Sequence, residues 1–330
     1  MPFFQPTVPP LPDTLSFAGK TVIVTGANTG LGFAAALQFA QRGAANLILA
    51  VRNTQSGEAA KSTILADPLV GNAKPTPAIF VEQLDLSLPS SVKSFTERTM
   101  MSFSELHVLL LNAGLGTLAW KKTPETGNEQ MLQINYLSNV LLATILLPLL
   151  RRTAKSTGAP SHVTFVGSRM ASQASFNSKP IPDSEPSLFA WLNNRKNNKI
   201  MRYGETKLLV AMWVAEAAAR VPASEVIIDN VCPGMVATGI NDGQILPLRI
   251  IIGIVFALRA RAPEVGARLV LNAATADEEA HGTLLGDTTV FKISFCETES
   301  GKKMQQKLWK ETSATVAEFS PGALQEAGLN

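Results

Sequence analysis

The stretch Thr21–Gly32, with the sequence TVIVTGANTGLG, decides the fold of this chain. Its first five residues are all β-branched and predict a buried strand, and the following turn carries glycines at positions 26, 30 and 32. Gly26 allows the tight turn, Gly30 lets the backbone approach a phosphate, and Gly32 permits close packing of the next helix on the sheet. Because the N-terminus of that helix faces the turn, the pattern favours binding of a pyrophosphate.

Strands and helices alternate along the chain on both sides of this stretch. Further strands are predicted at 46–51, 79–86, 107–111, 162–166 and 226–231, and helices at 30–42, 55–65, from 87 onward, 125–150, 203–220 and, as the last clear helix, 263–274. Such alternation implies right-handed βαβ crossovers and a parallel sheet with helices on both faces. We therefore predict a single α/β domain at 19–330, built on a doubly wound parallel sheet, after a proline-rich arm at 1–18.

The composition excludes several classes of protein. The chain has 330 residues, of which 46% are hydrophobic, so it is neither disordered nor fibrous. Its 29 basic and 26 acidic residues show no concentrated basic face, which argues against a nucleic-acid partner. Cys232 and Cys296 lie far apart and the three histidines do not cluster, so neither a disulfide framework nor a metal site is predicted. Cys232 is expected to be a buried apolar residue.

No stretch of the sequence predicts a transmembrane helix. Polar residues interrupt 137–150, and the apolar run 250–258 has nine residues where a spanning helix needs about 20. The start of the chain, with five prolines in 1–13, does not resemble a secretory signal, so a cytoplasmic protein is expected. The run 250–258 stays open to three interpretations: a segment over the substrate, a packed helix, or a peripheral membrane contact.

Seven features that follow in order between about residues 19 and 292 resemble the short-chain dehydrogenase/reductase family. They are the turn TGxxxGxG, Asp85, Asn112-Ala113-Gly114, Asn135, Ser168, the YxxxK pair Tyr203 and Lys207, and Pro233-Gly234. The long segment 169–202 between Ser168 and Tyr203 is similar to the enlarged loop of the retinol-dehydrogenase-like branch and of fungal secondary-metabolism members. Gly167 departs from the many members that have a second serine there, and we expect it to be tolerated.

The resemblance implies a Rossmann fold that binds a nicotinamide cofactor. The residues implied for cofactor binding are Gly26, Asn28, Thr29, Gly30, Leu31, Gly32, Arg52, Asp85, Leu86, Asn112, Ala113, Gly114, Tyr203, Lys207, Pro233, Gly234, Val236 and Thr238. The second strand ends at Arg52 without the acidic residue that would bind both ribose hydroxyls of NAD. A guanidinium suits a 2′-phosphate, so NADP(H) is predicted, with a solvent-facing arginine as the alternative.

The catalytic group implied by the resemblance is Asn135, Ser168, Tyr203 and Lys207. Four residues apart on a helix, Tyr203 and Lys207 share one face. The ammonium, together with an oxidised nicotinamide, would lower the pKa of the tyrosine from about 10 and let it exchange a proton with the substrate. By resemblance to the family, Ser168 would hold the carbonyl oxygen and Asn135 would anchor a water. Lys207 would also bind the nicotinamide ribose.

Each of these residues also has a simpler interpretation. An isolated YxxxK is commonly a surface pair, and Asn135 alone would be a hydrogen-bonding residue of the core. Ser168 would then be a cap at a strand end, and Asp85 a cap of the following helix.

The predicted function is reduction of a ketone or aldehyde of a hydrophobic small molecule by hydride transfer from NADPH, with Tyr203 as the acid. The segments 169–202 and 237–262 are expected to bound the substrate. The alternatives are a non-redox isomerase or cyclase that holds NADP, a retinol- or steroid-type alcohol dehydrogenase, and a catalytically silent NADPH-binding protein. Related enzymes commonly pair through the helices predicted here at 125–150 and 203–220. Two alternatives therefore stay open, a homodimer and a monomer that buries these helices in its own core.

Overall fold

Eight strands form one sheet in the computed structural model, which describes residues 5–73, 75–182, 184–198, 200–238 and 259–330. The strands are β1 (Thr21–Thr25), β2 (Asn46–Val51), β3 (Ala78–Gln83), β4 (Val108–Leu111), β5 (Ser161–Val166), β6 (Val226–Cys232), β7 (Leu284–Gly286) and β8 (Thr289–Val290). Their order is β3-β2-β1-β4-β5-β6-β7-β8, and every neighbouring pair is parallel except β7 and β8. The order reverses between β1 and β4, which is where a doubly wound sheet opens a crevice for a ligand.

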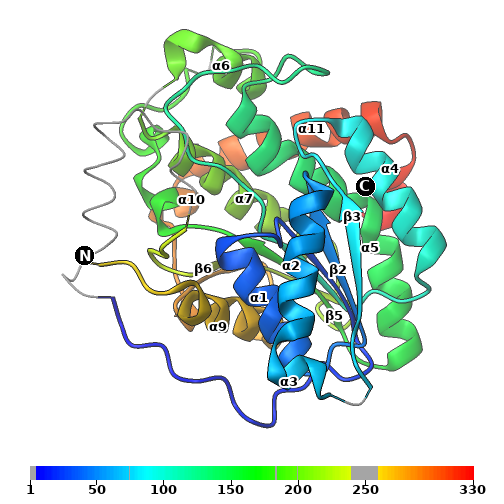
Figure 1. The fold of residues 1–330 in the computed structure, drawn as a ribbon. Helices are drawn as coiled ribbons and strands as arrows, with labels where there is room; N and C mark the ends of the chain where they lie inside the picture. Colours follow the sequence, from blue (N-terminus) through cyan, green and yellow to red (C-terminus); the bar gives the residue numbers. More distant parts are fainter. Residues whose placement is uncertain (1–4, 74, 183, 199, 239–258) are drawn as a thin grey trace.

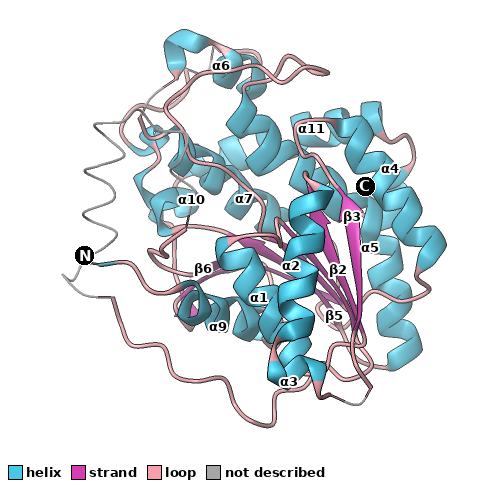
Figure 2. Cartoon of the chain, in the orientation of Figure 1, coloured by secondary structure: helices cyan, strands magenta, loops and turns pink. Residues whose placement is uncertain are grey.

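Helices cover both faces of the sheet, as Figures 1 and 2 show. The first face buries residues of α1 (Gly30–Gln41), α2 (Thr54–Ala66) and α9 (Pro263–Ala273). The second face buries residues of α4 (Pro89–Ser102), α5 (Ser138–Thr157) and α7 (Arg202–Ala218). The predicted α/β fold with a doubly wound, mostly parallel sheet is therefore confirmed.

The helix predicted at 125–150 differs from the observed one at both ends. The chain turns at 124–126, forms a π-helical segment at Leu132–Leu137, and continues as α5 to Thr157. Pro148 does not end the helix, because the surrounding leucines are buried against the sheet and outweigh the hydrogen bond that a proline cannot donate. The helix ends instead before Gly158, which has a left-handed φ of 72°. The third strand is also shorter than predicted, since it ends at Gln83 and not at residue 86.

The sequence-based expectation that the last clear helix ends near residue 274 was wrong. The longest C-terminal element is α11 (Glu299–Phe319), preceded by α10 (Ser294–Glu297) and followed by α12 (Ala323–Ala327). Few residues of α11 are buried, among them Leu308 and Val316, so its apolar stripe is narrow. The indole of Trp309 stacks on that of Trp213 in α7, with ring centres 6.4 Å apart. Packing on α7 thus supplies the apolar contact that the sequence pattern did not reveal.

Shorter elements complete the connections. They are α3 (Pro68–Gly71), α6 (Leu188–Asn193) and the 3-10 turns Arg169–Gln173, Ser175–Asn177, Arg195–Asn197 and Glu278–Ala280. The segment predicted between Ser168 and Tyr203 therefore carries one short helix, α6, at the top of Figure 1.

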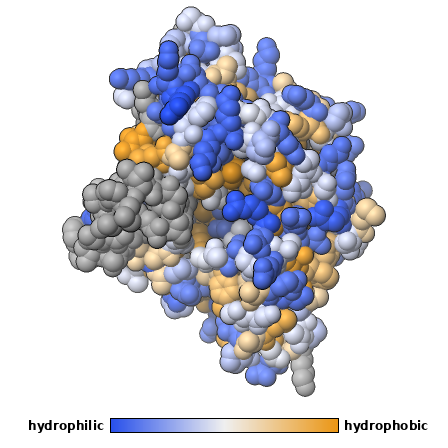
Figure 3. Space-filling model, turned by 45° about the horizontal axis from the view of Figure 1, so that its top comes forward, coloured by the Kyte–Doolittle hydropathy of each residue, from blue (hydrophilic) through white to orange (hydrophobic). Residues whose placement is uncertain are grey.

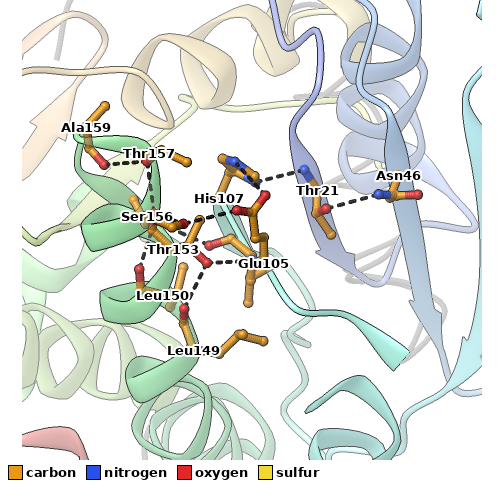
Figure 4. A network of polar contacts seen from close by, with 12 residues as sticks. Thr21, Asn46, Glu105, His107, Leu149, Leu150, Thr153, Ser156, Thr157 and Ala159 are labelled. Atoms are coloured by element: carbon orange, nitrogen blue, oxygen red, sulfur yellow. Dashed lines mark hydrogen bonds and ion pairs between the residues drawn. The ribbon is translucent and has the colours of Figure 1, made fainter. Parts of the chain in front are cut away.

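A polar network fixes the sheet at the end away from the glycine-rich turn (Figure 4). The Thr21 amide donates to Nδ1 of His107 at 3.0 Å, and Asn46 donates to the Thr21 hydroxyl at 3.1 Å. In the same network, Ser156 of α5 donates to Glu105 at 3.0 Å. Burial lowers the pKa of His107, and the ring serves here as a hydrogen-bond acceptor. These contacts tie β1, β2 and β4 to α5 and leave His107 without a part in the candidate site.

One helical stretch of the described residues, Leu132–Thr157, is long and apolar enough to cross a membrane. Its most apolar window is 89% buried inside the protein, so this stretch is the central helix of the core. The apolar run 250–258 lies outside the described residues. In the part of the chain that the structure describes, no group of three or more His, Cys, Asp or Glu residues is arranged to hold a metal ion.

Candidate active site

The glycine-rich turn between β1 and α1 needs a glycine at each of its three positions. Gly26 and Gly30 have left-handed φ values of 65° and 55°. A Cβ atom on Gly32 would lie 2.3 Å from the carbonyl oxygen of Gly26, so α1 packs directly on the turn. A Cβ on Gly30 would lie 3.1 Å from Cγ2 of Thr238, which places Thr238 directly against the turn. The turn, including Asn28, Thr29 and Leu31, therefore has the shape of a phosphate cradle.

Asn112-Ala113-Gly114 joins this turn to the rest of the site. The Asn112 amide donates to the Thr25 carbonyl at 2.9 Å, and the Ala113 N–H donates to the Thr25 hydroxyl at 2.9 Å. A Cβ on Gly114 would lie 3.1 Å from Oδ1 of Asn135 and 3.8 Å from Nζ of Lys207. The predicted cofactor residues after β4 therefore lie next to two of the four predicted catalytic residues.

Asn135 lies in the π-helical segment and is 2% exposed. Its Oδ1 accepts from the Leu115 N–H at 2.8 Å, and its Nδ2 donates to the Leu115 carbonyl at 2.9 Å and to the Thr206 hydroxyl at 3.2 Å. The side chain thus ties the loop after β4 to α7. π-helical turns inside α-helices occur frequently at functional sites, because the extra residue redirects backbone groups.

Tyr203 and Lys207 lie on one face of α7, as their spacing predicts. The Lys207 ammonium lies 5.5 Å from the centre of the Tyr203 ring and donates to the Val166 carbonyl at 2.6 Å. Burial lowers the pKa of Lys207 to about 8, and burial raises the pKa of the Tyr203 hydroxyl. In the chain by itself, the pKa of Tyr203 is thus raised by burial and is not lowered. The lowered pKa expected with an oxidised nicotinamide stays a prediction.

Ser168 follows β5 and is brought against the start of α7. Its Oγ accepts from the Met170 N–H at 3.1 Å, so it caps the 3-10 turn while its hydroxyl proton remains available. A Cβ on Gly204 would lie 2.5 Å from the Met170 carbonyl oxygen, so α7 packs directly on the turn that begins at Ser168. The structure therefore brings the turn that Ser168 caps against the start of α7, where Tyr203 lies.

Gly167 has a specific partner that explains the missing second serine. A Cβ at this position would lie 1.9 Å from Oδ1 of the fully buried Asn230 in β6. Asn230 therefore occupies the space that a side chain at 167 would need.

Cys232 lies at the site, which the sequence did not indicate. Its Sγ accepts from the Arg169 N–H at 3.3 Å, and its electrostatic effect raises the pKa of both Tyr203 and Lys207. Its place immediately before Pro233-Gly234 was the signal that could have located it, because β6 ends beside β5.

A buried ion pair at the start of α7 was also missed. The Arg202 guanidinium lies 3.3 Å from the carboxylate of Glu205, and both side chains are almost fully buried. Glu205 accepts from the Ser175 hydroxyl, and Arg202 donates to the Asn197 carbonyl at 3.1 Å. Desolvation lowers the pKa of Arg202, and the nearby carboxylates counteract that effect. The pair anchors the segment before α7 directly beside Tyr203.

Arg52 and Asp85 lie at the ends of β2 and β3. Arg52 is exposed, and within the part of the chain that the structure describes its guanidinium makes no ion pair or hydrogen bond. Asp85, two residues beyond β3, accepts at Oδ1 from the Ser87 N–H at 2.8 Å and from the Ser87 hydroxyl at 2.7 Å. Asp85 therefore closes the turn before α4 and does not cap that helix, whose N-cap residue is Leu88. Leu86 beside it is buried, and its carbonyl accepts from Ser138 at 2.6 Å.

The turn after β6 contains the last of the predicted cofactor-binding residues. Gly234 has a left-handed φ of 78°, and Val236 is buried against Gly266 of α9. The carboxyl ends of the strands point toward the top of Figure 1. When this side is turned forward, hydrophobic residues appear near its middle, below a mostly hydrophilic upper part (Figure 3).

Comparison with known proteins identifies relatives of this chain. The family model described as short chain dehydrogenase matches residues 20–179. The chain is 38% identical to the short chain dehydrogenase macD of Penicillium terrestre over 311 residues, which cover 93% of this chain and 94% of the relative.

Solved structures with this fold include complexes with different nicotinamide cofactors. The 3-ketoacyl-(acyl-carrier-protein) reductase of Brucella melitensis, complexed with NADH, has a TM-score of 0.58 and 19% identity, over 82% of this chain and 97% of that one. The alcohol dehydrogenase of the archaeon Thermococcus sibiricus, complexed with 5-hydroxy-NADP, has a TM-score of 0.56 and 21% identity, over 81% and 95% of the two chains. Likeness at these identities shows the fold alone.

Proposed function

The chain belongs to the short-chain dehydrogenase family, and from that premise we propose that it uses NADPH to reduce a ketone or aldehyde of a hydrophobic small molecule. The observation that carries the proposal is the pairing of Tyr203 with the buried ammonium of Lys207, beside Ser168 and next to the glycine cradle. The cradle fits a dinucleotide, because the left-handed turn at Gly26 and Gly30 leads directly into the N-terminus of α1, whose first N–H groups have no side-chain cap and suit a pyrophosphate. NADPH, when bound, supplies the hydride.

The four catalytic candidates have distinct proposed tasks. Tyr203 donates a proton to the carbonyl oxygen, and its raised pKa keeps the hydroxyl protonated near neutral pH, which is the form that reduction needs. Ser168 holds the same oxygen with its free hydroxyl proton. Lys207, with a pKa of about 8, is mostly charged at pH 7 and stabilises the phenolate left behind. Asn135 holds the loop after β4 against α7 and so orients Lys207.

The substrate class is proposed from the apolar sequence 250–258 and from the surface of the described residues. A sugar would need many hydrogen-bonding side chains, whereas hydrophobic residues lie near the middle of the face in Figure 3. A secondary metabolite with a bulky carbonyl group would suit such a surface.

The test is turnover of a panel of bulky ketones and aldehydes, followed by the loss of NADPH absorbance, with wild type and Tyr203→Phe. The substitution removes the acid and keeps the ring, so turnover should fall by about a thousandfold or more while NADPH still binds. Near-normal reduction by Tyr203→Phe would show that the proton has another source. Product formation without oxidation of NADPH would support the isomerase or cyclase alternative instead.

A further inference from the structure

The N-terminal arm reaches the turn that follows β6. The arm runs from the left side of Figure 1 around the lower edge of the molecule, and its first described residue is Gln5. The Gln5 amide nitrogen donates to the carbonyls of Met235 at 2.8 Å and Arg259 at 2.7 Å. The Gln5 amide oxygen accepts from the Met235 N–H at 2.7 Å. One side chain therefore satisfies both backbone groups of Met235, as a neighbouring strand would.

Arg261 also holds this turn, beside Gln5. Its Nη1 donates to the Pro233 carbonyl at 3.0 Å, and its Nη2 donates to the Pro6 carbonyl of the arm at 2.9 Å. The Arg261 N–H donates to the Met235 carbonyl at 2.8 Å. A Cβ on Gly234 would lie 2.1 Å from the Gln5 oxygen and 3.0 Å from Arg261 Nη1. Gly234 is thus required by the arm's presence as well as by its own positive φ.

The arm is anchored independently of Gln5. Val8 and Leu11 are buried in the core on the side of α1 and α9. Arg42 at the end of α1 donates to the Pro12 carbonyl at 2.8 Å. Prolines at 6, 9, 10 and 12 restrict the backbone of the arm before it docks. Gln5 is therefore delivered to the turn at a small entropic cost.

The turn that Gln5 holds connects two parts of the proposed cofactor site. At its far end, Thr238 packs against Gly30 of the phosphate cradle. Arg261, which binds Pro233, also pairs with Asp287 at 2.8 Å, and Asp287 pairs with Arg169 at 2.7 Å. Arg169 directly follows Ser168. A shift of the turn would therefore move groups at the phosphate cradle and at the start of the 3-10 turn beside Ser168.

We propose that Gln5 is a positioning residue for the nicotinamide half of the cofactor site. It acts by holding the Met235 backbone and thereby the turn Pro233–Thr238, and it leaves the adenosine half, near Arg52 and Asp85, untouched. The proposal rests on the proposed function in one respect, namely that NADPH is the cofactor.

The test compares Gln5→Ala with wild type in the binding of intact NADPH and of adenosine 2′,5′-bisphosphate, which lacks the nicotinamide half. Because up to three hydrogen bonds are lost, the Kd for NADPH should rise about tenfold or more, while the Kd for the bisphosphate stays within about twofold. The exposed neighbour Thr7, whose side chain makes no hydrogen bond within the described residues, provides the control Thr7→Ala, which should match wild type. Equal weakening of both ligands by Gln5→Ala, or no weakening of either, would overturn the proposal.

A second variant separates positioning from loss of folding. Gln5→Glu has the same shape but points a carboxylate, which has no hydrogen to donate, at the carbonyls of Met235 and Arg259, beside the Arg261 guanidinium. NADPH binding should therefore weaken as in Gln5→Ala while circular dichroism stays that of wild type. Wild-type affinity of Gln5→Glu for NADPH would contradict the proposed contact.

Hydrogen exchange of the Met235 amide in the cofactor-free protein is independent of cofactor identity. Gln5→Ala should speed this exchange at least about tenfold, because the amide loses its acceptor. Unchanged exchange would overturn the arm's role. Wild-type protein that fails to bind NADPH would instead sink the proposed function, and the exchange result would still decide whether Gln5 holds the turn.

Discussion

At the scale of single residues, Arg52 decides the proposed choice between NADPH and NADH. It is exposed at the end of β2, four residues before Ser56, whose hydroxyl accepts from the Asn28 amide of the glycine turn at 3.2 Å. Arg52→Ala should raise the KM for NADPH about 10- to 100-fold and that for NADH less than about twofold. Only NADPH carries the 2′-phosphate, which would lose its charged hydrogen bond to the guanidinium. Arg152→Ala, at an exposed position of α5, serves as the control in the same steady-state measurement. Equal effects on both cofactors would reject this role.

Lys207 should give the reaction a pH dependence in the alkaline range. Its pKa of about 8 means that the ammonium is present below this pH and is lost as the pH rises through it. The pH dependence of kcat/KM for NADPH reports the pKa values of groups in the free enzyme. This ratio should therefore fall about tenfold per pH unit well above pH 8. Burial raises the pKa of Tyr203, so Tyr203 is not the group that titrates there.

A pH–rate profile of Lys207→Arg is the matched comparison. Arginine stays charged throughout this range, so whatever activity remains should lose the step near pH 8. A flat wild-type profile up to pH 9.5 would contradict the assignment to Lys207.

At the scale of elements, α11 holds the inserted helix α6 in place. The Glu311 carboxylate accepts from the Ser187 hydroxyl at 2.8 Å and from the N–H groups of Leu188 at 2.7 Å and Phe189 at 3.0 Å. It therefore caps the start of α6 from a distant part of the chain. Glu311→Ala should lower the free energy of unfolding by about 1–3 kcal/mol, because these donors lose a charged acceptor.

The same variant tests whether the segment 169–202 bounds the substrate. The KM for the carbonyl substrate should rise severalfold, while the Kd for NADPH changes less than about twofold, since no cofactor candidate lies on α6. Glu318→Ala, exposed on the same helix, should change neither. If Glu311→Ala left both the stability and the substrate KM unchanged, α11 would have no part in holding this segment.

At the scale of the whole molecule, the C-terminal helices cover the face through which related enzymes commonly pair. Trp309 of α11 stacks on Trp213 of α7, and the Tyr136 hydroxyl hydrogen-bonds the Thr312 hydroxyl at 2.7 Å. Arg151 of α5 donates to the Ala327 carbonyl of α12 at 3.0 Å. The face is thus occupied by the chain's own residues, as Figure 1 shows for α11.

We therefore expect the intact protein to be a monomer of 35.2 kDa in solution. Light scattering during size-exclusion chromatography measures the mass directly. A chain that ends before residue 299 should self-associate, because it exposes apolar side chains of α5 and α7 to water. A stable dimer of the intact chain would contradict the expectation.

Local sequence patterns alone predict the alternation of strands and helices, the glycine turn and the residue types at the strand ends. These features depend on local patterns: alternation predicts the elements, and parallel strands bring their carboxyl ends to one edge. The YxxxK spacing likewise placed Tyr203 and Lys207 on one face, because neighbours four apart meet on any α-helix. The ends of helices and strands were less predictable, since burial let α5 continue through Pro148.

Only the tertiary structure decided which distant residues support the site. Gln5 and Met235 are 230 positions apart, Tyr136 and Thr312 are 176 apart, and Arg169 and Asp287 are 118 apart. The helix α11 was missed for the same reason, because its apolar stripe is narrow and its partner, Trp213, lies far away in the sequence. Such contacts carry no periodic signal: their energy comes from burial and hydrogen bonds between segments that meet only after the sheet has formed.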